Sequence, residues 1–307
     1  MKVVLFAYQE IGYVCFEELL RRGAEVAALI THPDDPGENI WFRSCAKLAA
    51  SRGIPVHVTE EVLSPKWPEI VASCKPELIF SVMFRKMIPM SVLDCASKGA
   101  YNLHPSLLPT YRGRCPVNWA LINGEPRIGL SLHEMVKRAD AGAIIAQTAV
   151  AIGPDEDVSD AYKKLAAVAP QLFGDAAERL AQGKAGRAVQ DDALATKFGG
   201  RGPKDGEFSW DWPARRIHNL VRAVAHPYPG AFFMNGAEKI FVWKTAVKEG
   251  QSAAPQGTAV SVAPLVAACG ENTLLELLRV QPENGPETSG AEFADKRGLA
   301  VNARIVK

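Results

Sequence analysis

The segment Lys2-Val3-Val4-Leu5-Phe6-Ala7-Tyr8 indicates the class of fold, because it is continuously apolar after its first residue. A short run of this kind is typical of a strand buried on both faces of a parallel sheet. Residues 14–22 follow with apolar side chains at helical spacing, and Gly23 ends them. We therefore predict a strand followed by a helix, the unit from which parallel sheets are built.

The same alternation continues through the first half of the chain. We predict further strands over residues 25–31, 55–58, 78–82, 100–104, 128–135 and 143–151, with helices over residues 42–52, 68–74, 88–95 and 159–182. Alternating strands and helices predict an α/β domain, a mostly parallel sheet with helices on both faces. Ligands of such sheets bind at the carboxyl ends of the strands.

The composition changes at residues 198–206, a glycine-rich stretch that we interpret as a linker. After it we predict a helix over residues 213–224 and short strands over residues 231–234, 239–246, 257–263, 265–269 and 274–281. Residues 282–290 have the composition of a loop. The expected organisation is a catalytic domain over residues 1–200 and a small β-rich, barrel-like domain over residues 207–307.

The composition excludes several classes of protein. The 307 residues carry a net charge of +1, which gives no sign of a nucleic-acid partner. The six cysteines include no Cys-x-x-Cys pair, so we expect reduced thiols in a cytoplasmic protein without a zinc ribbon. The start is expected to be a strand and not a signal peptide, and no apolar run approaches the roughly 20 residues that span a membrane.

The candidate chemistry lies where a predicted strand ends, in Asn102-Leu103-His104-Pro105. Asn102 and His104 are two residues apart, so their side chains point to the same side. Asp140 follows a later predicted strand. An amide can hold a developing oxyanion and an imidazole can move a proton, which is what acyl transfer requires. If Asp140 approaches His104, its charge would raise the pKa of the imidazole and favour the protonated form.

Other interpretations of these residues are weaker. Taken singly, the three are ordinary: a buried histidine, an asparagine at a strand end and a solvated aspartate. His104, His133 and Asp140 lack the close spacing of a metal site, so no metal is expected. Ser106 has no Gly-x-Ser-x-Gly turn around it. Gly12 does not complete the Gly-x-Gly-x-x-Gly pattern of dinucleotide sites, so no NAD is expected.

The run Asn102-x-His104-x-Ser106-Leu107-Leu108-Pro109-x-Tyr111-Arg112-Gly113, with Asp140-x-Gly142, resembles the 10-formyltetrahydrofolate-dependent formyltransferases. The resemblance covers essentially the whole chain and implies a Rossmann-like first domain and an OB-like second one. It implies that His104 handles the proton, Asn102 binds the oxyanion and Asp140 sets the pKa of His104. It also implies a folate pocket lined by Lys86, Met87, Ile88, Arg114, Val136, Lys137, Arg138, Ala139 and Asp140.

Within the family, the chain is most similar to the branch that formylates UDP-4-amino-4-deoxy-L-arabinose for lipid A modification and polymyxin resistance. The matching pieces are Phe6-Ala7-Tyr8, Thr31-His32-x-Asp34-x-Pro36-Gly37-Glu38 and residues 135–144. That branch carries a second, NAD-dependent decarboxylase half, which these 307 residues lack, so a separate decarboxylase is a partner to look for. His226 and Lys86 depart from the expected pattern.

Alternative functions stay open, and the first of them, methionyl-tRNA formyltransferase, has the same catalytic trio. Methionyl-tRNA formyltransferase needs broad phosphate neutralisation and has a long basic loop after the second strand. Here residues 34–38 form a short acidic loop, which argues against tRNA. A formyltetrahydrofolate hydrolase would need an ordered water in place of the amine, and the sequence does not decide this point. A protein that binds folate without transferring the formyl group is a further alternative, against which the intact trio argues.

Overall fold

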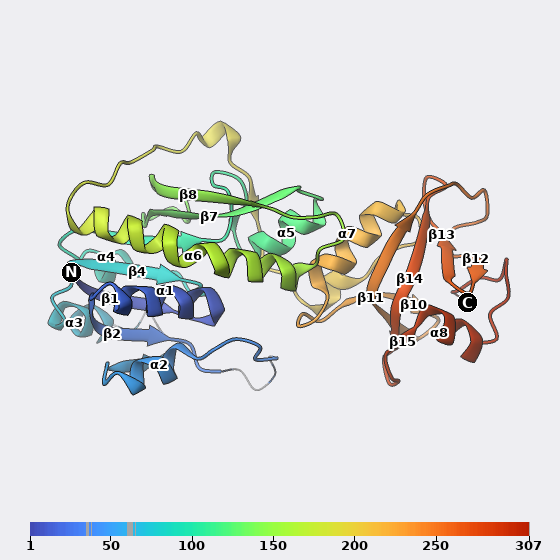
Figure 1. Ribbon diagram of the computed structural model, residues 1–307, viewed down its shortest axis with the longest axis horizontal. Coiled ribbons are helices and arrows are strands. Elements are labelled where there is room, and N and C mark those ends of the chain that lie inside the picture. Colours follow the sequence, from blue (N-terminus) through green and yellow to red (C-terminus); the bar gives the residue numbers. More distant parts are fainter. Residues whose placement is uncertain (35–36, 38, 60–63, 65, 307) are drawn as a thin grey trace. The chain divides into compact units, whose positions relative to one another are not determined.

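The computed structural model describes residues 1–34, 37, 39–59, 64 and 66–306, shown in Figure 1. These residues form two compact units. Unit 1 comprises Met1–Pro116, Arg127–Ala151 and Tyr162–Gly199, and unit 2 comprises Val117–Pro126, Ile152–Ala161 and Gly200–Lys307. The chain therefore changes units near residue 200, and two short segments from the first 200 residues pack with the C-terminal ones.

Unit 1 is built on a seven-stranded sheet in the order β3-β2-β1-β4-β5-β7-β8. The first five strands of this order run parallel, whereas β7 is antiparallel to both β5 and β8. This confirms the mostly parallel sheet expected from the sequence. The strands are β1 (Lys2–Ala7), β2 (Glu25–Thr31), β3 (Val56–Val58), β4 (Leu78–Val82), β5 (Ala100–His104), β7 (Arg127–Glu134) and β8 (Ile144–Ala151).

Helices cover both faces of this sheet, as predicted. Val4 and Phe6 of β1 share a buried cluster with Trp67 and with Val92, which come from α3 and α4. On the opposite face Phe80 packs edge-on against Phe173 of α6, with ring centroids 4.8 Å apart. No helix in the described ranges is both long and apolar enough to cross a bilayer. The helices of unit 1 are α1 (Gln9–Arg21), α2 (Cys45–Ser51), α3 (Lys66–Ser73), α4 (Met90–Leu93) and most of α6 (Val158–Ala181), whereas α5 (Pro116–Ile122) lies almost wholly in unit 2.

Unit 2 contains a six-stranded antiparallel sheet, which confirms the small β-rich unit. Its order is β10-β11-β14-β13-β12, and β15 pairs with β14. The expected loop at residues 282–290 ends in a helix that the sequence prediction missed, although Ser289 and Glu292 form a capping box at its start. The elements are α7 (Ala214–Val224), β10 (Ala231–Asn235), β11 (Glu238–Lys248), β12 (Ala259–Val262), β13 (Leu265–Ala268), β14 (Leu274–Pro282), β15 (Thr288–Ser289) and α8 (Gly290–Lys296).

A buried arginine holds the two early segments of unit 2. Arg222 of α7 donates hydrogen bonds to the carbonyls of Leu121, Gly153 and Glu156 and to the side chain of Asn219. We expect Arg222→Met to lower the free energy of unfolding of unit 2 by about 2–4 kcal/mol, because it leaves buried carbonyls without donors. Denaturant unfolding followed by tryptophan fluorescence measures this change. An unchanged midpoint and slope would contradict it.

Candidate active site

The candidate site lies at the carboxyl end of β5, in the middle of the sheet of unit 1. Asn102 and His104 occupy alternate positions of this strand and therefore point to the same side. The antiparallel register of β7 places His133 directly opposite Asn102. Asp140 lies in the turn after β7, with a left-handed backbone (φ 54°). The structure thus brings together all three residues that the sequence proposed, and adds His133.

The hydrogen bonds of His104 fix which ring nitrogen carries the proton. Its Nε2 lies 2.9 Å from the carbonyl oxygen of Tyr111, which can only accept, so Nε2 donates. The other nitrogen, Nδ1, faces Asp140 Oδ1 at 3.7 Å. Burial lowers the pKa of His104, and the charge of Asp140 raises it by less, so the pKa stays below its usual value. The charge of Asp140 thus acts on this pKa in the expected direction, but burial outweighs it, so the protonated form is not favoured overall.

The carboxylate of Asp140 joins two imidazoles. Its Oδ1 lies 3.5 Å from His133 Nε2, and its Oδ2 accepts the backbone N–H of Gly113 at 2.8 Å. Burial raises the pKa of Asp140, but His104, His133 and the Gly113 N–H together lower it to about 2. Asp140 is therefore ionised throughout the neutral range and provides a fixed negative charge beside His104.

His133 orients the amide of Asn102. Its Nδ1 donates to the carbonyl of Glu134 at 2.7 Å, so Nε2 accepts from Asn102 Nδ2 at 3.3 Å when the ring is neutral and faces Asp140 as a donor when the ring is protonated. One amide hydrogen of Asn102 is thus used, and the other is left to donate to a ligand. The sequence offers His133 only as a candidate metal ligand. Among the described residues, no group of three or more His, Cys, Asp or Glu side chains could hold a metal ion.

A distant segment fixes the backbone around Asp140. The amide of Gln190 donates to the carbonyls of Asp140 and Gly142, at 2.8 and 2.7 Å, and accepts from the guanidinium of Arg112. Asp192 then binds Arg112 at 2.9 Å and Arg138 at 2.6 Å. Gln190 is therefore a positioning residue for the Asp140 turn, and no local sequence pattern marks it as such.

We expect Gln190→Leu to lower kcat by up to about 30-fold, because two hydrogen bonds worth about 1 kcal/mol each no longer hold the Asp140 turn. The pH profile of kcat/KM should shift as well, since Asp140 acts on the pKa of His104. Steady-state kinetics between pH 5 and 9 measure both effects. Gln171→Leu, on the exposed face of α6, is the matched control. An unchanged pH profile in Gln190→Leu would show that its role is only structural.

The residues expected to line a folate pocket lie near the site residues in the sequence, but they differ in solvent exposure. Lys86 and Met87 are exposed after β4, whereas the side chain of Ile88 is buried among α3 and α4. Arg114 and residues 136–138 are exposed in the loops after β5 and β7, and Ala139 is half-buried. Arg138 is held by Asp192, so its charge is partly compensated. Their contact with folate stays a prediction.

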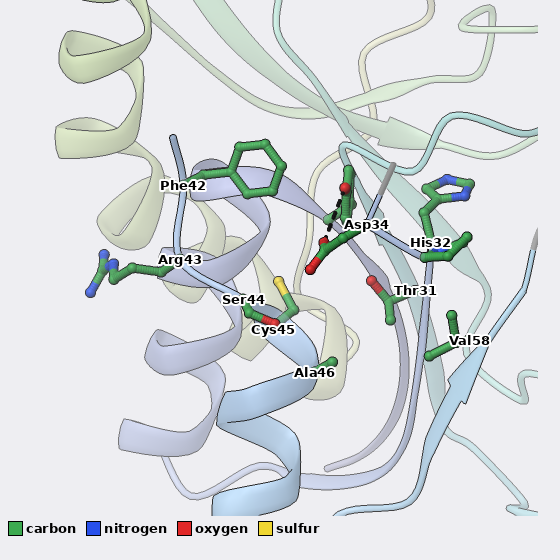
Figure 2. A pocket seen from close by; sticks show the side chains of 11 residues that line it. Thr31, His32, Asp34, Phe42, Arg43, Ser44, Cys45, Ala46 and Val58 are labelled. Carbon is green, nitrogen blue, oxygen red and sulfur yellow. Dashed lines mark hydrogen bonds between the residues drawn. The ribbon is translucent and has the colours of Figure 1, made fainter. Parts of the chain in front are cut away.

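A second feature of this sheet edge is a cavity of about 140 Å³ at the ends of β1 and β2. Figure 2 shows it between the strand end that carries Thr31 and His32 and the start of α2. Its other lining residues include Tyr8, Asp34 and Phe42. Several of these residues belong to the stretches that resemble the formyltransferase family, but the resemblance assigns them no role.

Comparison with known proteins covers both units. Residues 11–177 match the formyl transferase family, and residues 202–298 match the formyl transferase C-terminal domain. The crystal structure of WlaRD, a sugar 3N-formyl transferase in the presence of dTDP and 5-N-formyl-THF, is 17% identical, with 93% of this chain and 99% of that chain covered and a TM-score of 0.69.

Two further structures have the same fold. The N-formyltransferase from Helicobacter canadensis, in complex with folinic acid and dTDP-3-aminofucose, is 17% identical over 90% of this chain and 98% of that chain, with a TM-score of 0.71. HypX from Aquifex aeolicus, in complex with tetrahydrofolic acid, is 16% identical over 98% of this chain but only 48% of its own length, with a TM-score of 0.65. At these identities the likeness shows a shared fold.

Proposed function

The chain belongs to the formyl transferase family and is a formyltransferase, and we propose that it moves a formyl group from 10-formyltetrahydrofolate to the amine of a nucleotide-linked sugar. The observation that carries this proposal is the cluster of Asn102, His104 and Asp140 at one sheet edge. The WlaRD and Helicobacter canadensis structures support it, since each was obtained with a folate compound and with dTDP or a dTDP-linked amino sugar.

In the proposed reaction the neutral amine attacks the formyl carbon, and the carbonyl electron pair moves to oxygen. Asn102 donates its remaining amide hydrogen to this oxyanion. His104 begins neutral, because burial lowers its pKa, and its Nδ1 takes a proton from the attacking nitrogen. The imidazolium so formed is stabilised by Asp140 at 3.7 Å. When the oxyanion collapses, the bond from carbon to folate N10 breaks, and His104 returns the proton to that nitrogen.

For the acceptor we propose UDP-4-amino-4-deoxy-L-arabinose, on the basis of the matching sequence stretches at residues 6–8, 31–38 and 135–144. The acidic loop that argues against tRNA includes Asp35, Pro36 and Glu38, which lie outside the described residues, so this argument rests on the sequence. A cytoplasmic location is supported by six free cysteines. A separate decarboxylase that supplies the sugar nucleotide remains a partner to look for.

The test is the release of tetrahydrofolate from 10-formyltetrahydrofolate, measured with one acceptor at a time. The acceptors are UDP-4-amino-4-deoxy-L-arabinose, dTDP-3-aminofucose and initiator methionyl-tRNA, with a reaction without acceptor in parallel. Release with the UDP sugar alone supports the full proposal, and release with the dTDP sugar alone corrects the nucleotide. Release only with tRNA, or without any acceptor, would identify a methionyl-tRNA formyltransferase or a hydrolase instead.

A further inference from the structure

The cavity at the ends of β1 and β2 presents hydrogen-bond acceptors between apolar walls. The side chain of Asp34 accepts from the Tyr8 hydroxyl through Oδ1 at 3.3 Å, and no described group bonds its Oδ2. Thr31 is only 2% exposed, and its side chain lines the same cavity. Figure 2 shows both side chains beside the same space. A ligand that fills it should therefore bring hydroxyl donors.

The walls of the cavity favour a small ring and not an anion. The rings of Tyr8 and Phe42 meet edge-to-face at 5.0 Å, and Val58 adds a further apolar surface. The one arginine in the lining, Arg43, already binds Glu10 and lies 3.8 Å from Glu17. A ring that carries hydroxyl groups and has an apolar face, such as a ribose, fits this combination. In other doubly wound sheets an acidic residue after the second strand binds ribose hydroxyls in the same way.

The distance from this cavity to the reacting groups matches the length of a sugar nucleotide. Strands β2 and β5 are separated by β1 and β4, so three spacings of about 4.8 Å place the ends of β2 and β5 about 14 Å apart. About eleven bonds separate the amine of a 4-amino sugar from the ribose ring of its nucleoside diphosphate. At about 1.2 Å per bond in an extended chain, they span about 13 Å.

A positively charged side chain, that of Arg85, lies at the sheet edge between the cavity and the reacting groups at β5. Arg85 follows β4, is exposed, and holds its guanidinium 5.0 Å from the ring centroid of Tyr8. Its backbone N–H donates to His32 Nε2 at 2.9 Å, which ties the loop after β4 to the rim of the cavity. A diphosphate that runs from β5 to β2 passes the ends of β4 and β1, where this guanidinium can bind it.

We propose that the cavity binds the ribose of a ribonucleoside diphosphate sugar, with Asp34 accepting from the 2′- and 3′-hydroxyls and Thr31 completing the contact. The proposal rests on the proposed function, because it assumes that the amine of the same sugar nucleotide reaches the site at β5. It goes further in one respect: Asp34 selects a ribose over a 2′-deoxyribose, and therefore UDP sugars over dTDP sugars.

The proposal is tested by calorimetric titration of the full chain with UDP and with 2′-deoxy-UDP. We expect the wild-type protein to bind UDP about 10-fold more tightly, because the deoxy compound leaves a carboxylate oxygen without its donor. Asp34→Asn should weaken UDP binding by about 10- to 100-fold and abolish the preference between the two nucleotides. Thr31→Val, which keeps the shape of the side chain, should weaken UDP binding by several-fold.

Controls separate this site from folding and from the folate site. Folinic acid should bind all variants with wild-type affinity, and Asp94→Asn, an exposed carboxylate at the end of α4, should bind UDP as the wild type does. Thermal unfolding checks that each variant is folded. Loss of folinic acid binding in Asp34→Asn would overturn the proposal and assign the cavity to folate.

The remaining outcomes distinguish the ribose site from the proposed function. If Asp34→Asn binds UDP normally while the wild type formylates a sugar nucleotide, the function stands and the ribose site is wrong. Equal losses for UDP and 2′-deoxy-UDP in Asp34→Asn would also overturn the selection for ribose. If the wild type formylates no sugar nucleotide and binds neither nucleotide, the proposed function fails and the ribose site fails with it.

Discussion

Replacing Asn102 by alanine lowers kcat by about 10²–10³-fold, the usual effect of losing one oxyanion donor. The reason is the fixed direction of its amide. His133 Nε2 accepts one amide hydrogen at 3.3 Å, so the second can meet the developing oxyanion without any rearrangement. Alanine provides no donor. Substrate binding should change far less than turnover, because the donor is needed most when negative charge forms on the formyl oxygen.

Single-turnover formyl transfer measures this effect directly, with folinic acid binding as a check that the folate site is intact. Asn123→Ala, an exposed asparagine after α5, is the matched control and should keep wild-type turnover. More than about a tenth of wild-type turnover in Asn102→Ala would contradict an oxyanion role. Asn102→Asp gives a further comparison, because it keeps the size of the side chain but offers a carboxylate where a donor is needed.

Replacing Asp140 by asparagine should lower kcat/KM by about 10³-fold, since a neutral amide cannot stabilise the imidazolium of His104. The carboxylate lies 3.7 Å from His104 Nδ1 and is held there by the Gly113 N–H and by the Gln190 contacts to its backbone. The substitution keeps the shape of the side chain and removes only its charge. The turn should therefore persist while the proton transfer fails.

The pH dependence of Asp140→Asn gives a second, independent measurement. Neutral His104 is the active form, and burial lowers its pKa, so in the wild type kcat/KM should fall only below about pH 6.5, the usual pKa of histidine. Asp140 raises this pKa, so its removal should move the acid limb to a still lower pH. Titration of the His104 ring by NMR follows the same shift. An unchanged titration would show that the two residues are not coupled.

Local residue patterns are enough to predict the central strands and the position of the reacting groups. The bounds of β4 and β5 match the prediction, because β4 is a short apolar run that follows Glu77 and β5 lies between Gly99 and Pro105. Side-chain alternation then placed Asn102 and His104 on one side, and parallel strand order placed them at the ligand-binding edge. These conclusions need only local spacing and the general rules of parallel sheets.

The contacts that orient and bury the site residues come from the packing of distant segments. His133 reaches Asn102 because β7 runs antiparallel to β5, and Gln190 holds the Asp140 turn from 50 residues away. The pKa of His104 falls because other segments bury it, and Thr31 and Asp34 meet at one cavity because α2 closes over the end of β2. Strand direction, burial and cavities depend on contacts between segments far apart in the chain, and no local pattern of residues specifies such contacts.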